Sequence, residues 1–250
     1  MYSLTIDLNC DMGEGCGNDA ELIRFISSAN IACGYHAGDE DTMKWTVDLA
    51  LENGVAIGAH PGYRDRENFG RTPMDLTPEE IGSLITEQIG VLDEITKAAG
   101  GSITHVKPHG ALYNKAARDR DLAGAIARAV SDYDRGLALF GLSGSESIDE
   151  AKKCGLRTVS EVFADRTYQT DGSLTSRNAP NALIQDENTA LMQVLDMIKY
   201  GRVRSTDGIM IAITAETVCI HGDGQNAVKF ARTINQALTE TGILIKPVNG

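Results

Sequence analysis

Hydrophobic residues occur along this chain in short runs that alternate with longer amphipathic segments, and the alternation continues from end to end. Short apolar runs are typical of buried strands, whereas apolar residues spaced three or four apart are typical of helices. A repeated strand–helix order predicts a parallel sheet covered by helices. We expect strands at residues 4–8, 30–33, 55–59, 103–107, 137–140, 157–160 and 218–221.

The amphipathic segments predict helices near residues 20–28, 42–53, 78–99, 122–132, 145–154, 187–200 and 225–239. The helix at 78–99 has the best-defined start, because the sequence TPEE places Thr77 before Pro78 and Glu80 three residues after Thr77. A hydroxyl cap, a proline in the first turn and a carboxylate at that distance form a capping box.

Seven strand–helix units without a break in composition favour one closed domain over two open sheets. We therefore expect an α/β fold, a seven-stranded (β/α) barrel related to the TIM barrel and of the glycoside hydrolase/deacetylase type, spanning residues 1–250 as a single domain. Residues 209–213 and 243–245 are expected to add strands outside the ring. Residues 162–186 are too long for a simple connection, and their composition favours a lid.

The chain is acidic, with 35 Asp and Glu against 23 Lys and Arg and a formal charge of -12. No basic run interrupts this acidity, so nucleic acid and anionic membranes are not expected as partners. No apolar stretch approaches the ~18 residues that a membrane helix needs. The five cysteines are an odd set without a C-x-x-C pair. Free thiols and the absence of a signal-peptide pattern predict a cytoplasmic protein.

Polar side chains gather where the predicted strands end, and in a parallel barrel these ends form the face that carries active sites. Lys107 is the most informative of them, because an ammonium at the end of an apolar strand would face the barrel mouth and could stabilise an oxyanion. In the alternative interpretation its stem only extends to solvent. The candidate residues are Asp7, Asn9, Asp11, Glu14, His36, His60, Lys107, His109, Glu161, Asp165, Arg166, Arg177, His221 and Asp223.

Several neighbouring residues have simpler explanations. Asp39 or Asp41 can cap the helix that follows, and Tyr113 can pack its ring against the barrel rim. The sequence HGDGQNA at residues 221–227 matches a dinucleotide-binding pattern, but one such match late in a chain is a weak signal. The chain contains neither a phosphate-binding G-x-x-x-x-G-K-[ST] loop nor the G-x-S-x-G turn of serine hydrolases.

Six ordered blocks, DLNCDMGEG, ANIACGYHAGD, GAHPGYRDRENFGR, VKPHGALYN, EVFADRTYQTDGSLTSR and CIHGD, resemble the signature blocks of the LamB/YcsF family. The resemblance covers essentially the whole chain. It implies a seven-stranded barrel that takes part, as the A subunit with partner subunits B and C, in cleaving the lactam of 5-oxo-L-proline to L-glutamate. The resemblance also implies ATP as a cosubstrate that is converted to ADP and phosphate.

Under this hypothesis Lys107 and His109 lie near the lactam oxygen, and Asp11 or Glu161 is the base for water. Asp165 is a further catalytic candidate. Asn9, Arg166 and Arg177 would bind the substrate carboxylate or a phosphate, and the remaining substrate contacts are expected from Asp7, Glu14, His36, His221 and Asp223.

A divalent metal, Mg²⁺ or another, is a further expectation. Asp11, His60 and His109 follow neighbouring strands and form a ligand set of the type that deacetylase-like barrels use. A rival function is therefore a metal-dependent deacetylase of amino sugars, which the low aromatic content of 5% disfavours. A second rival is a non-catalytic subunit that presents the substrate to its partners.

Overall fold

The computed structural model describes residues 4–222 and 227–248, and seven parallel strands in it form a closed ring. The ring closes because β1 pairs with β9 on one side and with β2 on the other. This confirms the predicted seven-stranded barrel. In order around the ring the strands are β1 (Thr5–Met12), β2 (Ser28–Ala32), β3 (Ala56–His60), β4 (Ile103–Val106), β5 (Ala138–Leu142), β6 (Arg157–Phe163) and β9 (Thr217–Ile220).

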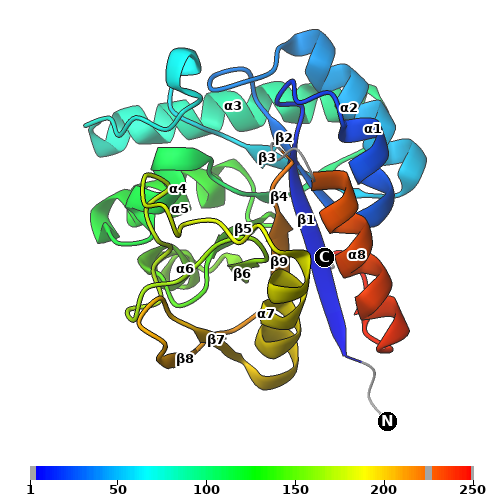
Figure 1. The fold of residues 1–250 in the computed structure, drawn as a ribbon. Helices are drawn as coiled ribbons and strands as arrows, with labels where there is room; N and C mark the ends of the chain where they lie inside the picture. Colours follow the sequence, from blue (N-terminus) through cyan, green and yellow to red (C-terminus); the bar gives the residue numbers. More distant parts are fainter. Residues whose placement is uncertain (1–3, 223–226, 249–250) are drawn as a thin grey trace.

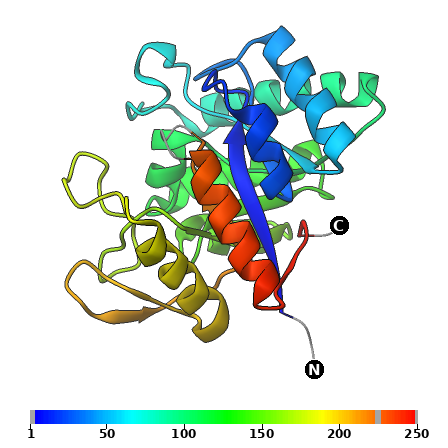
Figure 2. The same cartoon turned by 45° about the vertical axis from the view of Figure 1, so that its right-hand side comes forward.

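Helices surround the ring, and α8 lies along β1 in both views of the ribbon (Figures 1 and 2). The capping box of α3 is confirmed, since Thr77 Oγ1 accepts a hydrogen bond from Glu80 N and Glu80 Oε2 accepts one from Thr77 N. The helices are α1 (Asp19–Leu22), α2 (Glu40–Asn53), α3 (Pro78–Ala98), α4 (Gly110–Ala116), α5 (Arg120–Tyr133), α6 (Glu146–Lys153), α7 (Glu187–Tyr200) and α8 (Ala227–Glu240), with 3₁₀ turns η1 (Ile23–Phe25) and η2 (Arg66–Asn68).

The boundaries predicted for the first strand and the first helix were wrong. The first strand runs to Met12 instead of ending at residue 8. The predicted helix at 20–28 ends at Phe25, because Ile26 is already extended and Ser27 N donates to Leu8 O at 2.8 Å. Helix α4 and strand β7 (Arg202–Arg204) were not predicted, and the start of the helix predicted at 225–239 lies outside the described residues.

Both extra strands lie outside the ring, as expected. Strand β8 (Met210–Ala212) pairs antiparallel with β7, and β10 (Leu244–Ile245) pairs with the first residues of β1. After β6, residues 164–186 form an irregular hairpin with isolated bridges, one of which joins Tyr168 to Leu174. No helix in the described part of the chain is long and apolar enough to cross a membrane.

Strand β1 alternates strictly between two environments. Ile6, Leu8 and Met12 belong to the main hydrophobic core between the barrel and its helices. Asp7, Asn9 and Asp11 point the other way, into the barrel, where side chains of other strands bind them. Asn9 and Asp11, which were predicted to follow the strand, are therefore part of it, because side chains alternate along a strand. The interior of this barrel is therefore polar, unlike the apolar layers of many TIM barrels.

Gly58 makes room for one of these interior side chains. A Cβ atom at this position would lie 2.1 Å from Nε2 of His105, whose ring stacks on Phe140 at a centroid distance of 4.2 Å. The imidazole is held by Asn30, whose Oδ1 lies 2.9 Å from His105 Nε2. The absence of a side chain at residue 58 thus lets His105 cross the barrel towards β2.

We expect Gly58→Ala to destabilise the fold, since overpacking a filled interior costs about 1–3 kcal/mol. The matched control is Gly82→Ala in α3, where an added Cβ meets nothing within 4 Å. That substitution should stabilise the protein by about 0.5–1 kcal/mol because alanine favours the helix. Unfolding in urea, followed by circular dichroism, measures both effects. Equal stability of the two variants would contradict the interior packing.

Candidate active site

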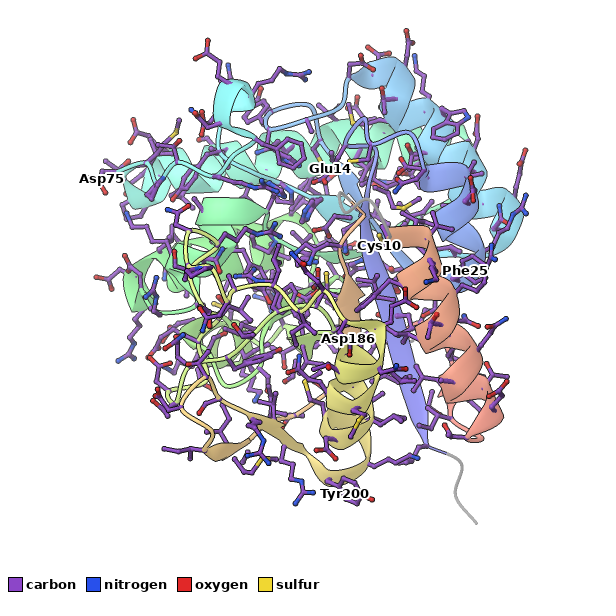
Figure 3. The ribbon with its side chains drawn as sticks, viewed as in Figure 1. Cys10, Glu14, Phe25, Asp75, Asp186 and Tyr200 are labelled. Carbon is purple, nitrogen blue, oxygen red and sulfur yellow. The ribbon has the colours of Figure 1, made fainter. Side chains whose placement is uncertain are left out.

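A cavity of about 640 Å³ opens at the C-terminal ends of the strands, on the face where active sites of such barrels occur. Glu14, beyond Cys10 on the way out of β1, lies toward this end, and Tyr200 at the C-terminal end of α7 lies at the far end of the molecule (Figure 3). The lining includes the predicted residues Asp11, Glu14, His60, Lys107, His109, Arg166, Arg177 and His221. The structure therefore brings together side chains from five separate segments of the sequence.

Lys107 is buried at the floor of the cavity. Its Nζ lies 2.8 Å from Asp11 Oδ1 and 2.9 Å from Glu161 Oε1. The ammonium also lies 3.2 Å from Asn9 Oδ1 and 3.2 Å from Cys219 Sγ. Burial alone would lower the pKa of Lys107, but Asp11, Cys219 and Glu161 together hold that pKa well above its usual value. All three N–H donors of the ammonium therefore contact protein atoms. The sequence predicted a contact of this ammonium with a ligand oxygen but did not reveal these protein partners.

Asn9 and Asp7 support this floor and do not line the cavity. Asn9 donates to Glu161 Oε1 at 2.9 Å and to Thr217 Oγ1 at 2.7 Å, and its own oxygen accepts from Asn30. Asp7 accepts hydrogen bonds from Ser27, Ser28 and Thr217. Because the protein itself satisfies both side chains, they position Glu161 and the strands in this structure, and their contact with substrate stays a prediction.

Tyr113 lines the cavity close to Glu161, and each side chain has a buried oxygen without a hydrogen-bond partner among the described residues. Neither the Tyr113 hydroxyl nor Glu161 Oε2 makes a hydrogen bond of good geometry within the described residues. They are close enough that burial, and after it the Glu161 carboxylate, raises the pKa of Tyr113 well above its ordinary value. Packing against the rim was an open interpretation of Tyr113, and its ring does contact Phe163 edge-to-face. Its unpaired hydroxyl gave no signal in the sequence.

Four possible metal ligands converge beside Lys107. One ligand atom from each of Glu14, His36, His60 and His109 lies within 4.8 Å of all the others. Glu14 Oε1 is 3.2 Å from His36 Nε2 and 3.3 Å from His109 Nδ1. The predicted set of Asp11, His60 and His109 is thus partly reproduced, since Asp11 Oδ2 lies 3.3 Å from His60 Nε2 while Asp11 Oδ1 binds Lys107.

Two imidazoles of the cluster each donate a hydrogen bond to a backbone carbonyl through the ring nitrogen that faces away from the cluster. His60 Nδ1 donates to Lys107 O at 2.7 Å, and His109 Nε2 donates to Phe69 O at 2.9 Å. The two inner nitrogens, His60 Nε2 and His109 Nδ1, lie 2.9 Å apart and face the carboxylates of Asp11 and Glu14. Burial, and after it His60, lowers the pKa of His36 to about 2 and that of His109 well below its usual value. Neutral imidazoles are the form that binds metals.

Two further predicted groups lie across the cavity from these ligands. His221 Nδ1 donates to Asp165 Oδ1 at 2.8 Å, an arrangement that orients an imidazole for proton transfer. Arg166 is buried and Arg177 lines the cavity beside it. Asp223, also predicted as a substrate contact, lies outside the described residues. The loop at residues 164–186 supplies the two arginines and further lining residues of the cavity, and its role as a lid stays a prediction.

A closed (β/α) barrel with a cavity of ionisable side chains at its strand ends defines the class of the protein: a TIM-like barrel with the site on the usual catalytic face. Residues 6–250 match the model of the LamB/YcsF family. The chain belongs to this family, which confirms the resemblance of its six sequence blocks.

Two relatives support this assignment. The chain is 56% identical over 246 residues to a protein of Geobacillus kaustophilus named as the A subunit of 5-oxoprolinase, covering 97% of this chain and 96% of the relative. It is 44% identical to the crystal structure of a lactam utilization protein from Thermus thermophilus, with a TM-score of 0.91 over 97% of this chain and 99% of the other. The peptidoglycan deacetylase PdaC from Bacillus subtilis shares the fold alone, at 13% identity and a TM-score of 0.53 over 99% of this chain and 89% of that one.

We expect Lys107→Met to destabilise the barrel by about 3–5 kcal/mol, because it leaves the buried carboxylates of Asp11 and Glu161 without their counter-charge. Adding Glu161→Gln removes one of these charges, so the double variant should be more stable than the sum of the single effects by at least about 1 kcal/mol. Urea unfolding of the four proteins of the cycle measures this coupling. Strict additivity would show that the three charges do not act together.

The control for this cycle is Lys44→Met. Lys44 makes an ion pair with Glu40 at 2.6 Å, and both side chains are more than half exposed. Because exposed pairs are screened by water, this substitution should change stability little.

Proposed function

We propose that this chain is the lactam-cleaving A subunit of an ATP-dependent 5-oxoprolinase that also contains subunits B and C. The observation that carries the proposal is the cavity, in which an ionised carboxylate next to a buried lysine faces an imidazole oriented by a second carboxylate. The high identity to a relative named as the A subunit of 5-oxoprolinase supports this substrate. The five free cysteines fit a cytoplasmic location as part of the same proposal.

A five-membered lactam resists water because its amide is stabilised by resonance, so the carbonyl carbon must be activated. In the proposed sequence the lactam oxygen attacks the γ-phosphorus of ATP, ADP leaves, and the ring nitrogen loses its proton. Water then adds to the resulting phosphorylated imidate carbon, and the C–N bond breaks as the nitrogen takes up protons. A second water hydrolyses the acyl phosphate to glutamate and phosphate, which balances the overall reaction.

Asp11 is the base for the attacking water in this scheme. Although burial raises the pKa of Asp11, His60 and Lys107 outweigh this effect and hold it well below the usual value, so the carboxylate is ionised at neutral pH. Lys107 acts through Asp11, and Glu161 acts through Lys107, so both are positioning residues. His221, oriented by Asp165, donates a proton to the leaving nitrogen.

The cluster of Glu14, His36, His60 and His109 fits a divalent transition metal. Three nitrogen donors and one carboxylate suit zinc and similar ions better than Mg²⁺, which prefers oxygen ligands. A cation held there would supply a Lewis acid for the oxygen of the scissile group. The same cluster favours the rival function of a metal-dependent deacetylase, although the fold similarity to PdaC carries no substrate with it.

Mixing the purified chain with subunits B and C, ATP and 5-oxoproline should release glutamate. Asp11→Asn should lower kcat by about 100-fold to 10,000-fold, the usual contribution of a general base. Asp48→Asn on the exposed face of α2 is the matched control and should leave the rate unchanged.

The rival functions predict different results in the same assay. An unchanged rate for Asp11→Asn in an intact complex would assign the chain a non-catalytic presenting role. Release of acetate from N-acetylglucosamine oligomers by the isolated chain, without glutamate release by the complex, would favour the deacetylase.

We expect the chain to bind one equivalent of Zn²⁺. The variant His60→Gln should bind Zn²⁺ more than about 100-fold more weakly, because losing a ligand atom of the metal costs more affinity than losing a hydrogen bond that orients such a ligand. The control is His105→Gln, since His105 lies in the barrel interior outside the cluster. Isothermal titration with Zn²⁺, together with metal analysis after dialysis, measures both. Equal Zn²⁺ binding by the two variants would exclude the cluster as the site.

A further inference from the structure

Phe69 has a left-handed backbone conformation at the end of the 3₁₀ turn η2. With a φ of 57° it is the single non-glycine residue of positive φ in the ranges 4–222 and 227–248. This conformation is rare for a bulky residue because the Cβ atom crowds the backbone. Residues held in it gather at functional sites, where the surrounding structure outweighs the strain. Phe69 lines the cavity, so its strained backbone belongs to the candidate site.

Hydrogen bonds close a turn around Phe69 and hold its backbone. Gly70 N donates to Asp65 O at 2.7 Å. The Asp65 carboxylate accepts one hydrogen bond from Asn68 Nδ2 at 2.7 Å and another from Thr72 N at 3.1 Å. The turn is thus bonded on both sides of Phe69, which fixes the direction of its carbonyl group.

This carbonyl group selects the ring nitrogen of His109 that faces the cluster. Phe69 O lies 2.9 Å from His109 Nε2. Because a carbonyl oxygen carries no proton, the hydrogen bond places the proton on Nε2, and in the neutral ring Nδ1 then has the free lone pair. Nδ1 lies 3.3 Å from Glu14 Oε1, inside the group of possible metal ligands. The Phe69 carbonyl therefore determines that His109 offers Nδ1 as its ligand atom.

The ring of Phe69 and the backbone of Gly70 pack against two imidazoles of the cluster. The Phe69 ring meets His36 and His109 edge-to-face, at centroid distances of 5.8 and 5.3 Å. The two imidazoles stack on each other at 3.8 Å. A Cβ atom at Gly70 would lie 2.8 Å from His36 Cβ and 2.9 Å from His109 Cδ2. The turn thus approaches the imidazole pair closely enough to limit rotation of both rings.

We propose that Phe69 is a positioning residue of the four-ligand cluster: its left-handed backbone holds the carbonyl that fixes the tautomer of His109, and its ring limits the rotation of the imidazoles of His36 and His109. This inference rests on the proposed function only for the metal, because the tautomer of His109 is a property of the metal-free chain. Outer partners that orient a ligating imidazole contribute to metal affinity in this way.

Two substitutions separate the backbone of Phe69 from its ring. Phe69→Asn and Phe69→Val both remove the ring, but asparagine tolerates a positive φ whereas a β-branched residue does not. We expect Phe69→Val to bind Zn²⁺ about 10-fold to 100-fold more weakly than Phe69→Asn, the usual effect of losing an outer partner of a metal ligand. Isothermal titration with Zn²⁺ measures both affinities.

The tautomer of His109 gives a second readout that needs no metal. Long-range proton–nitrogen correlation spectra of the chain with nitrogen-labelled histidine, at neutral pH, should show the Nε2–H form in the wild-type protein and in Phe69→Asn. In Phe69→Val the Nδ1–H form should appear as well, because the hydrogen bond to the carbonyl of residue 69 is weakened. The spectrum of His109→Gln identifies the signals of His109.

Gly208→Val is the matched control for backbone strain. Gly208 has a φ of 81° in the turn between β7 and β8, does not line the cavity, and an added Cβ there meets nothing within 4 Å. The substitution imposes the same kind of strain on a different turn, so it should lower the thermal unfolding midpoint and leave the His109 tautomer and the Zn²⁺ affinity unchanged. This control separates positioning from a general loss of stability.

Three results would overturn the role of Phe69: the Nδ1–H form of His109 in the wild-type chain, the Nε2–H form retained alone in Phe69→Val, or measurable but equal Zn²⁺ affinity in Phe69→Asn and Phe69→Val. The last of these would retain the cluster as a metal site. A tautomer that changes in Phe69→Val although the wild-type chain binds no Zn²⁺ would reject the metal and retain the positioning role. If Phe69→Val does not fold, Phe69→Ala takes its place, since alanine also disfavours a positive φ.

Discussion

The charge of Lys107 inside the barrel is the constraint on which the rest of the structure depends. A buried ammonium is tolerated only where acceptors surround it, and here Asp11, Glu161, Asn9 and Cys219 do so from three other strands. Each of these partners needs partners of its own, so Asn9 binds Thr217 and Asn30. One lysine thus requires a hydrogen-bonded network across the barrel, and the network in turn holds Asp11 in the cavity wall as an ionised carboxylate.

A polar interior leaves hydrophobic stabilisation to the layer outside the ring. The outward residues of β1, such as Ile6 and Leu8, pack under the helices in the main core, and a small separate apolar cluster lies around Phe140. Burial of apolar side chains between sheet and helices therefore stabilises the fold, while the interior side chains determine the chemistry. This division allows site residues to sit on strands, which hold side chains more rigidly than loops do.

The sequence pattern was sufficient for the ring of strands, because alternating apolar runs and amphipathic segments are local signals that survive in the fold. The pattern did not predict the direction in which the polar side chains of the strands point. Asp7 and Asn9 were recognised as unusual, but a pattern of polarity does not reveal that the strand continues to Met12 and turns these residues inward. Helix α4 was not predicted because it is only 7 residues long, too short for a clear helical pattern. The pairing of Glu14 with His36 depends on contacts between residues distant in sequence, as does the isolation of Arg166.

Two buried cations line the same cavity, and their surroundings assign them different tasks. Lys107 has all its donors engaged by carboxylate, amide and thiol groups of the protein, so its charge is already balanced before any ligand arrives. Arg166 has one carbonyl contact and no ion pair among the described residues. The Lys107 floor of the cavity is therefore satisfied within the chain, whereas at Arg166 a buried nitrogen, Nε, has no hydrogen-bond partner among the described residues.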